Sequence, residues 1–365
     1  MNANRRIRRI EAPSPGQMRR RYLATQRPVI LTNLYTGDPI RRIDTRAKAE
    51  RRLASLPVQI KPEASRGMFR AYQRGTPPPP PVAPKPSKLG AYLRRLERNP
   101  ATDLLCSELD TPGMLRDLFT LPAYARMPPG EDEVLSMIFG AGEGNYAHMH
   151  YDGDLRHVIL YQVFGRKRIL LVPPSQSLRM LPMKNQSFIQ FGDFSERDRA
   201  EFVRFVGGYD FFLEPGEAVY IPPAWWHHIE YVTTSLSVNV RFGRNRYAKF
   251  LGDNLHLGPY GQAVGSRFAH ESLIDEAAEK QFHRIRRAFY RSYETPAKRY
   301  WKLEGLLREA FATLCPDAVQ APYGCTRLSA FEAVAGMGRY REYEEFYAAH
   351  GRTWPPPEEK NAWNR

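Results

Sequence analysis

The chain of 365 residues is strongly basic, with 54 Lys and Arg against 39 Asp and Glu and a formal net charge of +15. Its composition, 42% hydrophobic and 25% charged, is ordinary for a globular protein, and the length allows one large domain with an appendage or two domains. No apolar run approaches the ~18 residues that a membrane span requires, and no apolar segment follows the basic start, so we expect neither a membrane span nor a signal peptide.

The cysteines and the charge bear on the cellular compartment and on the kind of partner. Cys106, Cys315 and Cys325 are too few and too scattered for a disulfide framework or a zinc cluster, which fits a reducing compartment, and we expect a cytoplasmic protein. The positive charge would attract nucleic acid, an acidic peptide or an anionic surface. Because the Arg residues are spread along the chain and are not gathered in one stripe with interleaved aromatic residues, a solvated basic surface is favoured over a nucleic-acid interface.

The N-terminal part alternates polar stretches with short apolar runs. Residues 1–20 are basic with little periodicity, so we expect a flexible start. Residues 28–31 and 58–60 are β-branched runs that predict buried strands. The proline-rich stretch 75–88 predicts a stiff surface loop that cannot join the interior of a sheet or helix, with a ligand for a proline-recognising domain as the alternative. Helical periodicity follows at residues 89–96.

The middle of the chain has the pattern of β-structure, and the last third has that of helices. The apolar runs of the middle part predict strands at 134–139, 158–163, 168–172, 218–221 and 235–240. Short strands separated by turn signals indicate an all-β sandwich or barrel. Apolar residues at helical spacing then predict helices at 272–292, 298–314 and 328–349. These helices would form either a dimerisation or substrate-gripping module or a cap packed on the barrel, since both need one apolar face.

Three side chains form a candidate metal site. His150 and Asp152 lie two residues apart in YAHMHYD, and on a strand that spacing places both on one face. The distant segment YIPPAWWHHIEY offers His227 as a third ligand. Two imidazoles and a carboxylate leave three open positions on an ion, as in non-haem iron(II) oxygenases, whereas zinc more often has a closed tetrahedral set. The H-x-D pair alone is a weak signal, because His150 alone fits a buried core histidine equally well.

A longer pattern surrounds these residues. The run HYD…QVFGRKRILLVPP from residue 150 to 174, followed by EPGEAVYIPPAWWHHIEY and SVNV, resembles the JmjC-domain, cupin-like hydroxylases, closest to the factor-inhibiting-HIF type. The resemblance covers roughly residues 20–245. It implies a mainly β fold, a double-stranded β-helix (jelly-roll) barrel with N-terminal α/β elements. The implied organisation is a flexible basic N-terminus at 1–20, a catalytic domain at 21–245 and a C-terminal helical region at 246–365, which often forms homodimers in relatives.

The resemblance also implies a chemistry. It implies an Fe(II)- and 2-oxoglutarate-dependent dioxygenase that hydroxylates a peptide or protein side chain. His150, Asp152 and His227 match the catalytic iron ligands of the family, with His228 as the competitor for the distal position. Lys167 matches the lysine that pairs with the far carboxylate of 2-oxoglutarate, where a buried carboxylate needs a charge-assisted partner.

Other cosubstrate positions match less completely. Asn239 matches a family asparagine on the last barrel strand, where its spacing from Ser237 suggests one polar face; the alternative is an ordinary polar strand residue. Ala147 and Val158 stand where relatives often have Thr or Ser and Asn. No tyrosine aligns with the family's upstream cosubstrate-binding tyrosine, which would be sought near residues 104–105. Polar residues that would compensate are His148, His157 and Tyr161.

The sequence leaves several substrates and functions open. The charge suggests an acidic peptide or a protein bound to RNA. A tRNA- or ribosome-associated hydroxylase is one alternative, and a metal-binding cupin without oxygenase activity is another. Ala147 and Val158 favour the second alternative, whereas Lys167 and the complete ligand set oppose it. A histone demethylase is the weakest reading, because the chain contains no zinc finger or chromatin-reader module.

Overall fold

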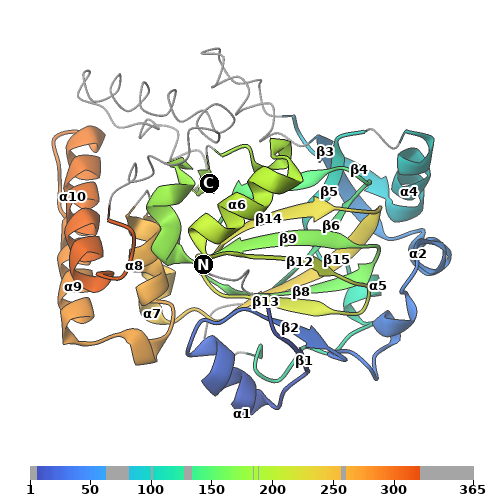
Figure 1. Cartoon of the computed structure of the whole chain (residues 1–365), viewed down its shortest axis with the longest axis horizontal. Coiled ribbons are helices and arrows are strands. Elements are labelled where there is room, and N and C mark those ends of the chain that lie inside the picture. Colours follow the sequence, from blue (N-terminus) through green and yellow to red (C-terminus); the bar gives the residue numbers. More distant parts are fainter. Residues whose placement is uncertain are drawn as a thin grey trace.

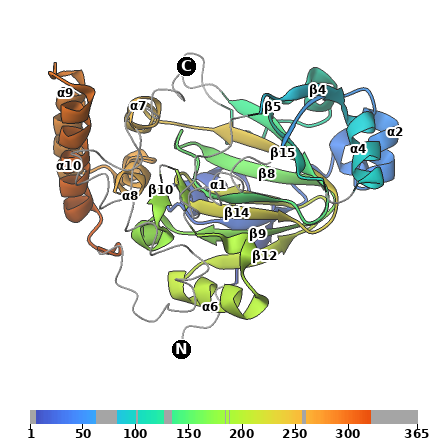
Figure 2. The same cartoon turned by 90° about the horizontal axis from the view of Figure 1, so that it is seen from above.

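Two β-sheets lie face to face and form a jelly-roll barrel, as the sequence predicts (Figure 2). The computed structural model describes residues 6–62, 82–99, 102–126, 134–183, 185–187, 189–255 and 260–320. Within these residues the larger sheet contains, in spatial order, β1 (Arg9–Glu11), β2 (Val29–Thr32), β13 (Ala218–Ile221), β8 (His157–Phe164), β15 (Ser235–Phe242), β6 (Leu135–Ala141), β5 (Leu104–Asp110), β3 (Pro57–Pro62) and β4 (Lys85–Lys88). The smaller sheet contains β10 (Pro182–Met183), β11 (Gln186–Ser187), β7 (Tyr146–His150), β14 (Trp226–Tyr231), β9 (Lys167–Val172) and β12 (Tyr209–Leu213).

The barrel interior is an apolar layer between the two sheets. Along β8, Val158 and Leu160 point into this layer, whereas Ile159 and Tyr161 point outward into a second core. All eight residues of β8 are buried, because the larger sheet is covered on both faces. Each fully buried Val, Leu or Ile of this kind contributes about 1.5–3 kcal/mol relative to an exposed one. The barrel is therefore a rigid frame for side chains that point inward.

The N-terminal part packs on the outer face of the larger sheet. Helices α2 (Arg46–Leu53) and α4 (Leu89–Arg98) bury their apolar sides there. The expected flexible start at 1–20 differs from the structure: β1 pairs in parallel with β2, and a capping box of Ser14 and Gln17 begins helix α1 (Pro15–Met18). The surface loop expected at 75–88 is wrong in its last part, because residues 85–88 form β4. β4 is an edge strand, where a proline removes no ladder hydrogen bond; residues 75–81 lie outside the described residues.

Helices cover the outer face of the smaller sheet and one end of the barrel. They are α6 (Glu196–Val206), α7 (Arg246–Asn254), α8 (Gly261–Arg267), α9 (Glu276–Tyr290) and α10 (Pro296–Leu314). α9 and α10 lie side by side at the end of the molecule that is farthest from α2 and α4 (Figures 1 and 2). Their buried side chains Phe282, Ile285 and Leu307 join the apolar cluster between these helices and the outer face of the smaller sheet, as the alternative of a helical cap expects. The helix predicted at 328–349 lies outside the described residues, and no helix of the described part is long and apolar enough to cross a membrane.

Candidate metal centre

The pairing of β7 with β14 brings two of the predicted ligands together. His150 and His227 are directly opposite each other in this antiparallel pair, and their ring centres are 4.2 Å apart. The next paired residues are Ala147 and Ile229, so β7 has one more residue than β14 over this interval. This bulge places Ala147 and His150, three residues apart, on the interior side.

Asp152 completes the cluster from beyond the end of the strand. β7 ends at His150, so the H-x-D pair is not wholly within a strand as the sequence suggested. The alternation of side chains nevertheless continues, because Tyr151 packs outward against Trp226 with ring centres 4.9 Å apart. One ligand atom each from His150, Asp152 and His227 lies within 4.8 Å of the others. The local H-x-D pair and the distant histidine thus converge on one point.

Backbone carbonyls orient both imidazoles. His150 Nδ1 lies 2.6 Å from the carbonyl oxygen of His148, and His227 Nδ1 lies 3.0 Å from that of Trp225. Because a carbonyl only accepts, each Nδ1 carries the proton and donates it, which leaves the lone pair on Nε2 for an ion. Burial, with the neighbouring His150, lowers the pKa of His227 to about 4. His227 is therefore neutral at pH 7, the form that binds metal.

Arg241 on β15 holds the carboxylate. Its Nη2 lies 2.9 Å from Asp152 Oδ1 and 2.8 Å from Asp154 Oδ1. Burial alone would raise the pKa of Asp152, but the Arg241 guanidinium and then His227 and His150 hold it below its usual range. Asp152 is thus ionised, with one oxygen on Arg241 and the other available to an ion.

Lys167 on β9 is fully buried, and its amine forms no ion pair within the part of the chain that the structure describes. Its Nζ donates to Ser237 Oγ at 2.6 Å and lies 4.6 Å from the ring centre of Tyr231. No ion pair joins it to a carboxylate of the described residues. Burial lowers the pKa of Lys167 to about 7. An ammonium in such surroundings is costly until an anion accompanies it, so the position suits the carboxylate of a ligand.

One strand face joins these two charged groups. Ser237, Asn239 and Arg241 alternate along β15 and share its inward face, as the spacing of Asn239 predicts, whereas Val238 and Val240 point into the outer core. Ser237 contacts Lys167 and Arg241 contacts Asp152, so Asn239 lies between the two ends. The Asn239 Oδ1 atom is buried and has no hydrogen-bond partner among the residues that the structure describes. A polar ligand between Lys167 and the three candidate metal ligands would satisfy it.

Comparison with known proteins decides the family. The model of the cupin-like domain matches residues 15–246, well over half of the chain. This chain belongs to the cupin-like domain family. The resemblance seen in the sequence is therefore confirmed.

Curated relatives match this cupin-like domain over part of their length. Lysine-specific demethylase JMJ30 of Arabidopsis thaliana is 32% identical over 161 residues, 40% of this chain and 36% of the relative. Jumonji C domain-containing protein 5 of Drosophila melanogaster is 29% identical over 42% of this chain and 38% of the relative. tRNA wybutosine-synthesizing protein 5 of Mus musculus is 27% identical over 41% of this chain and 45% of the relative. The chain thus matches less than half the length of these three relatives.

The competing histidine of the cupin-like domain points the other way. His228 follows His227 on β14, so it projects outward. Its Nε2 lies 3.1 Å from Glu230 Oε1, and its ring packs 5.0 Å from that of Tyr146. Glu230 is also paired with Arg199. His228 therefore has its own partners in the outer layer and does not reach Asp152.

The departures from the family pattern make one interior wall apolar. Ala147 and Val158 both pack in the core between the sheets, and neither supplies a polar atom there. The residues expected to compensate do not face inward. The His148 ring contacts the backbone of β11, His157 Nδ1 lies 2.8 Å from the Tyr220 hydroxyl, and Tyr161 belongs to the outer core. A ligand in this cupin-like domain would therefore depend on polar groups from other strands.

Two polar side chains that point into the barrel from other strands were missed in the sequence analysis. Tyr231 lies four residues after His227 on β14 and packs with Leu105, close to the region where a tyrosine was sought. Arg241 lies two residues after Asn239 on β15. The even spacing of each from a recognised site residue is the signal that would have found it.

The turn before His227 is secured by the C-terminal helices. Ala224 has a positive φ of 60°, which a non-glycine residue adopts only at a cost of about 1–2 kcal/mol. The buried Gln262 of α8 donates to the Ala224 carbonyl and accepts from the Ser177 hydroxyl. Trp225 packs between the sheets and Trp226 packs outside them, so the two tryptophans stabilise the turn from opposite sides.

Gln262→Leu is expected to destabilise the protein by about 1–3 kcal/mol, because it removes the hydrogen bonds that Gln262 makes to the Ala224 carbonyl and with the Ser177 hydroxyl in a buried site. Thermal unfolding followed by circular dichroism would measure the loss. The alanine variant of the partly exposed Gln281 serves as a control and should unfold at the wild-type temperature. An unchanged melting temperature for Gln262→Leu would mean that the turn is held by its own packing.

Proposed function

We propose that this cupin-like chain is an Fe(II)- and 2-oxoglutarate-dependent oxygenase that hydroxylates a peptide or protein side chain. The observation that carries the proposal is the facial set of His150, Asp152 and His227, whose ligand atoms lie within 4.8 Å of one another. Two neutral imidazoles and one ionised carboxylate are the donors that non-haem iron(II) sites of this kind use. The buried Lys167, which has no carboxylate partner among the described residues, adds a place for an anionic cosubstrate.

Each residue has a separate task in the proposed reaction. His150, Asp152 and His227 would hold the iron, and Arg241 would keep Asp152 ionised and oriented. Lys167 would bind the distal carboxylate of 2-oxoglutarate, and Asn239 would contact its keto-acid end. Iron bound there, with 2-oxoglutarate and dioxygen as cosubstrates, would supply the oxidising power for an unactivated C–H bond: one oxygen atom would go to the substrate, and the other to succinate as 2-oxoglutarate loses carbon dioxide. The apolar wall that includes Ala147 and Val158 would exclude water from the site.

Three alternatives are each suggested by a specific observation. A tRNA-linked substrate is suggested by the names of relatives that synthesise wybutosine and by the net charge of +15. A metal-binding cupin without oxygenase activity is suggested by the apolar Ala147 and Val158. Demethylation is the activity in the name of the Arabidopsis relative. Side-chain hydroxylation is preferred because the sequence resemblance implies it, whereas demethylation rests on the name of one relative matched over 36% of its length.

Anaerobic titration of the Fe(II)-loaded protein with 2-oxoglutarate tests the proposal. We expect a weak visible charge-transfer band that is absent in His227→Ala and retained in the matched control His228→Ala. Iron that stays bound without any band would favour the cupin that lacks oxygenase activity. Equal loss of iron in both histidine variants would mean that the cluster is not the metal site.

The affinity for 2-oxoglutarate is expected to fall as the pH rises above about 7. Burial lowers the pKa of Lys167 to about 7, so the free protein loses this charge above that pH, whereas the bound carboxylate restores it. Binding then takes up one proton, and the dissociation constant should rise about tenfold per pH unit between about pH 7.5 and 8.5. Titrations at several pH values measure the slope. The Lys167→Arg variant, whose side chain stays charged, should show no dependence of the dissociation constant on pH in this range. A dissociation constant of the wild type that does not change with pH would contradict the role of Lys167.

A further inference from the structure

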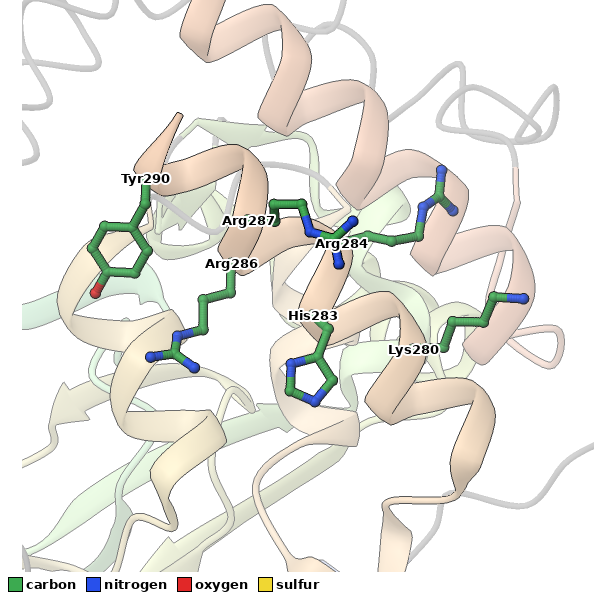
Figure 3. A pocket seen from close by; sticks show the side chains of 6 residues that line it. All are labelled: Lys280, His283, Arg284, Arg286, Arg287 and Tyr290. Carbon is green, nitrogen blue, oxygen red and sulfur yellow. The ribbon is translucent and has the colours of Figure 1, made fainter. Parts of the chain in front are cut away.

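The outer side of α9 has a concentration of positive charge that the candidate metal centre does not use. From residue 280 to 291 the sequence is KQFHRIRRAFYR, with five Lys or Arg residues and no acidic residue. Phe282 packs against Tyr247 and Phe250 of α7, and Ile285 is buried on the same side of α9, so the helical period places the cations on the solvent side. The residues of this surface, which we call the α9 basic surface, are Lys280, His283, Arg284, Arg286, Arg287 and Tyr290. They line an open hollow of about 680 Å³, and all six side chains project from one helix (Figure 3).

Most of this charge is not neutralised by the described residues. Arg284 forms an ion pair with Glu309 of α10 at 2.6 Å. For Lys280, Arg286 and Arg287, no ion pair joins the side chain to a carboxylate of the described part of the chain. Like charges held within two helical turns repel one another, and an anion on this surface would relieve the repulsion. A second copy of the same surface would increase it, so a dimer through this face is disfavoured.

An exposed aromatic ring lies among these cations. Tyr290 is 67% exposed, and the Arg286 guanidinium carbon is 5.9 Å from its ring centre. His283 is exposed about two turns earlier on the same helix. An acidic peptide would use the cations but has no need of an exposed ring. A polyanion with unpaired bases would use both, because a base stacks on the ring while Arg binds phosphate through two N–H groups.

We propose that the α9 basic surface binds single-stranded RNA, with Arg286 and Arg287 on phosphates and Tyr290 stacked on an unpaired base. Unpaired RNA bases are recognised by stacking of this kind, whereas duplex DNA is read by polar side chains in a groove, and Gln281 is the one amide in the sequence from 280 to 291. Lys280 and Arg291 are about 16 Å apart along the helix axis, enough for about five stacked nucleotides. The proposal does not depend on oxygenase activity, because the surface lies outside the barrel.

Fluorescence anisotropy with a labelled unstructured RNA of about 12 nucleotides and the full chain tests the proposal. Arg286→Glu with Arg287→Glu should weaken binding at least about thirtyfold. The slope of log affinity against log salt concentration should fall in magnitude by about 0.7 for each phosphate that the variant no longer neutralises. The matched control is Arg51→Glu with Arg52→Glu on α2, which makes the same charge change on exposed residues at the other end of the molecule.

We expect this control on α2 to weaken RNA binding less than about threefold. Circular dichroism melting checks that both double variants fold. Arg286→Gln with Arg287→Gln replaces the α9 pair if the glutamate variant does not fold. Equal weakening in the α9 and α2 double variants would overturn the proposal, as would tighter binding of single-stranded DNA of the same sequence.

Substitutions of the ring separate stacking from charge. Tyr290→Ala should weaken RNA binding by about tenfold, whereas Tyr290→Phe, which keeps the ring, should bind as the wild type does. Competition by poly-glutamate as effective as that by RNA, with Tyr290→Ala unchanged, would overturn the proposal and assign the surface to an acidic protein instead.

Discussion

Replacing Asp152 with alanine is expected to abolish turnover and to weaken Fe(II) binding by more than about a hundredfold, with the fold retained. Asp152 supplies the carboxylate of the proposed facial set, and two neutral imidazoles alone bind a hard divalent ion weakly. The fold should survive because Asp152 lies beyond the end of β7 and Arg241 keeps its second partner, Asp154. Iron content after anaerobic reconstitution and succinate formation measure the two effects.

His228→Ala is the matched control for this prediction. It removes a neighbouring buried imidazole that bonds to Glu230 and not to the candidate metal ligands. Iron content should stay at the wild-type value, although the protein should be less stable because Glu230 loses a partner. An Asp152→Ala protein that still binds iron and turns over would exclude the proposed centre.

Replacing Arg241 with alanine is expected to have the largest effect on stability, about 3–5 kcal/mol, because it leaves Asp152 and Asp154 as neighbouring, largely buried carboxylates without this cation. A bound divalent ion would supply the missing positive charge. Adding Fe(II) or Mn(II) anaerobically should therefore raise the melting temperature of the variant more than that of the wild type. Thermal unfolding with and without metal measures both quantities.

The control for Arg241 is an ion pair of similar length on the surface. Arg166 and Glu214 are 2.7 Å apart, but their side chains are 42% and 45% exposed. Arg166→Ala should cost about 0–1 kcal/mol, and metal should not restore it. If Arg241→Ala were as mild as this control, Arg241 would have no part in holding the carboxylate.

Regular patterns of apolar residues were enough to predict much of the barrel. The β-branched runs at 28–31, 58–60 and 158–163 correspond to β2, β3 and β8, and the helical pattern at 89–96 corresponds to α4. β14 was missed because its sequence WHHIEY has little alternation of apolar and polar residues, and β4 was missed because it contains a proline. Whether such segments form strands depends on packing between the sheets, and the local sequence pattern carries no information about that packing.

The residues of the candidate site could be predicted only in part, for a related reason. His150 and Asp152 are near each other in the sequence, and His227 was found through a resemblance. Arg241 was not singled out in the sequence, because the ion pair that turns it toward Asp152 joins residues 89 positions apart. The cations of α9 were likewise read as dispersed, although one helix face gathers them. Charge in a sequence does not tell which strand or helix face will present it.

The inward face of β15 has a consequence for the size of the acid that we propose binds there. Ser237, which contacts Lys167, and Arg241, which contacts Asp152, are four residues apart on a strand that rises about 3.3 Å per residue. The strand therefore keeps these two contact residues about 13 Å apart along the backbone and fixes the separation between Lys167 and Asp152 that they set. A keto acid that lacks a second carboxylate would reach one end only. Exchanging side chains would change how tightly the acid binds, but a different preferred length would require a residue to be inserted in the strand or removed from it.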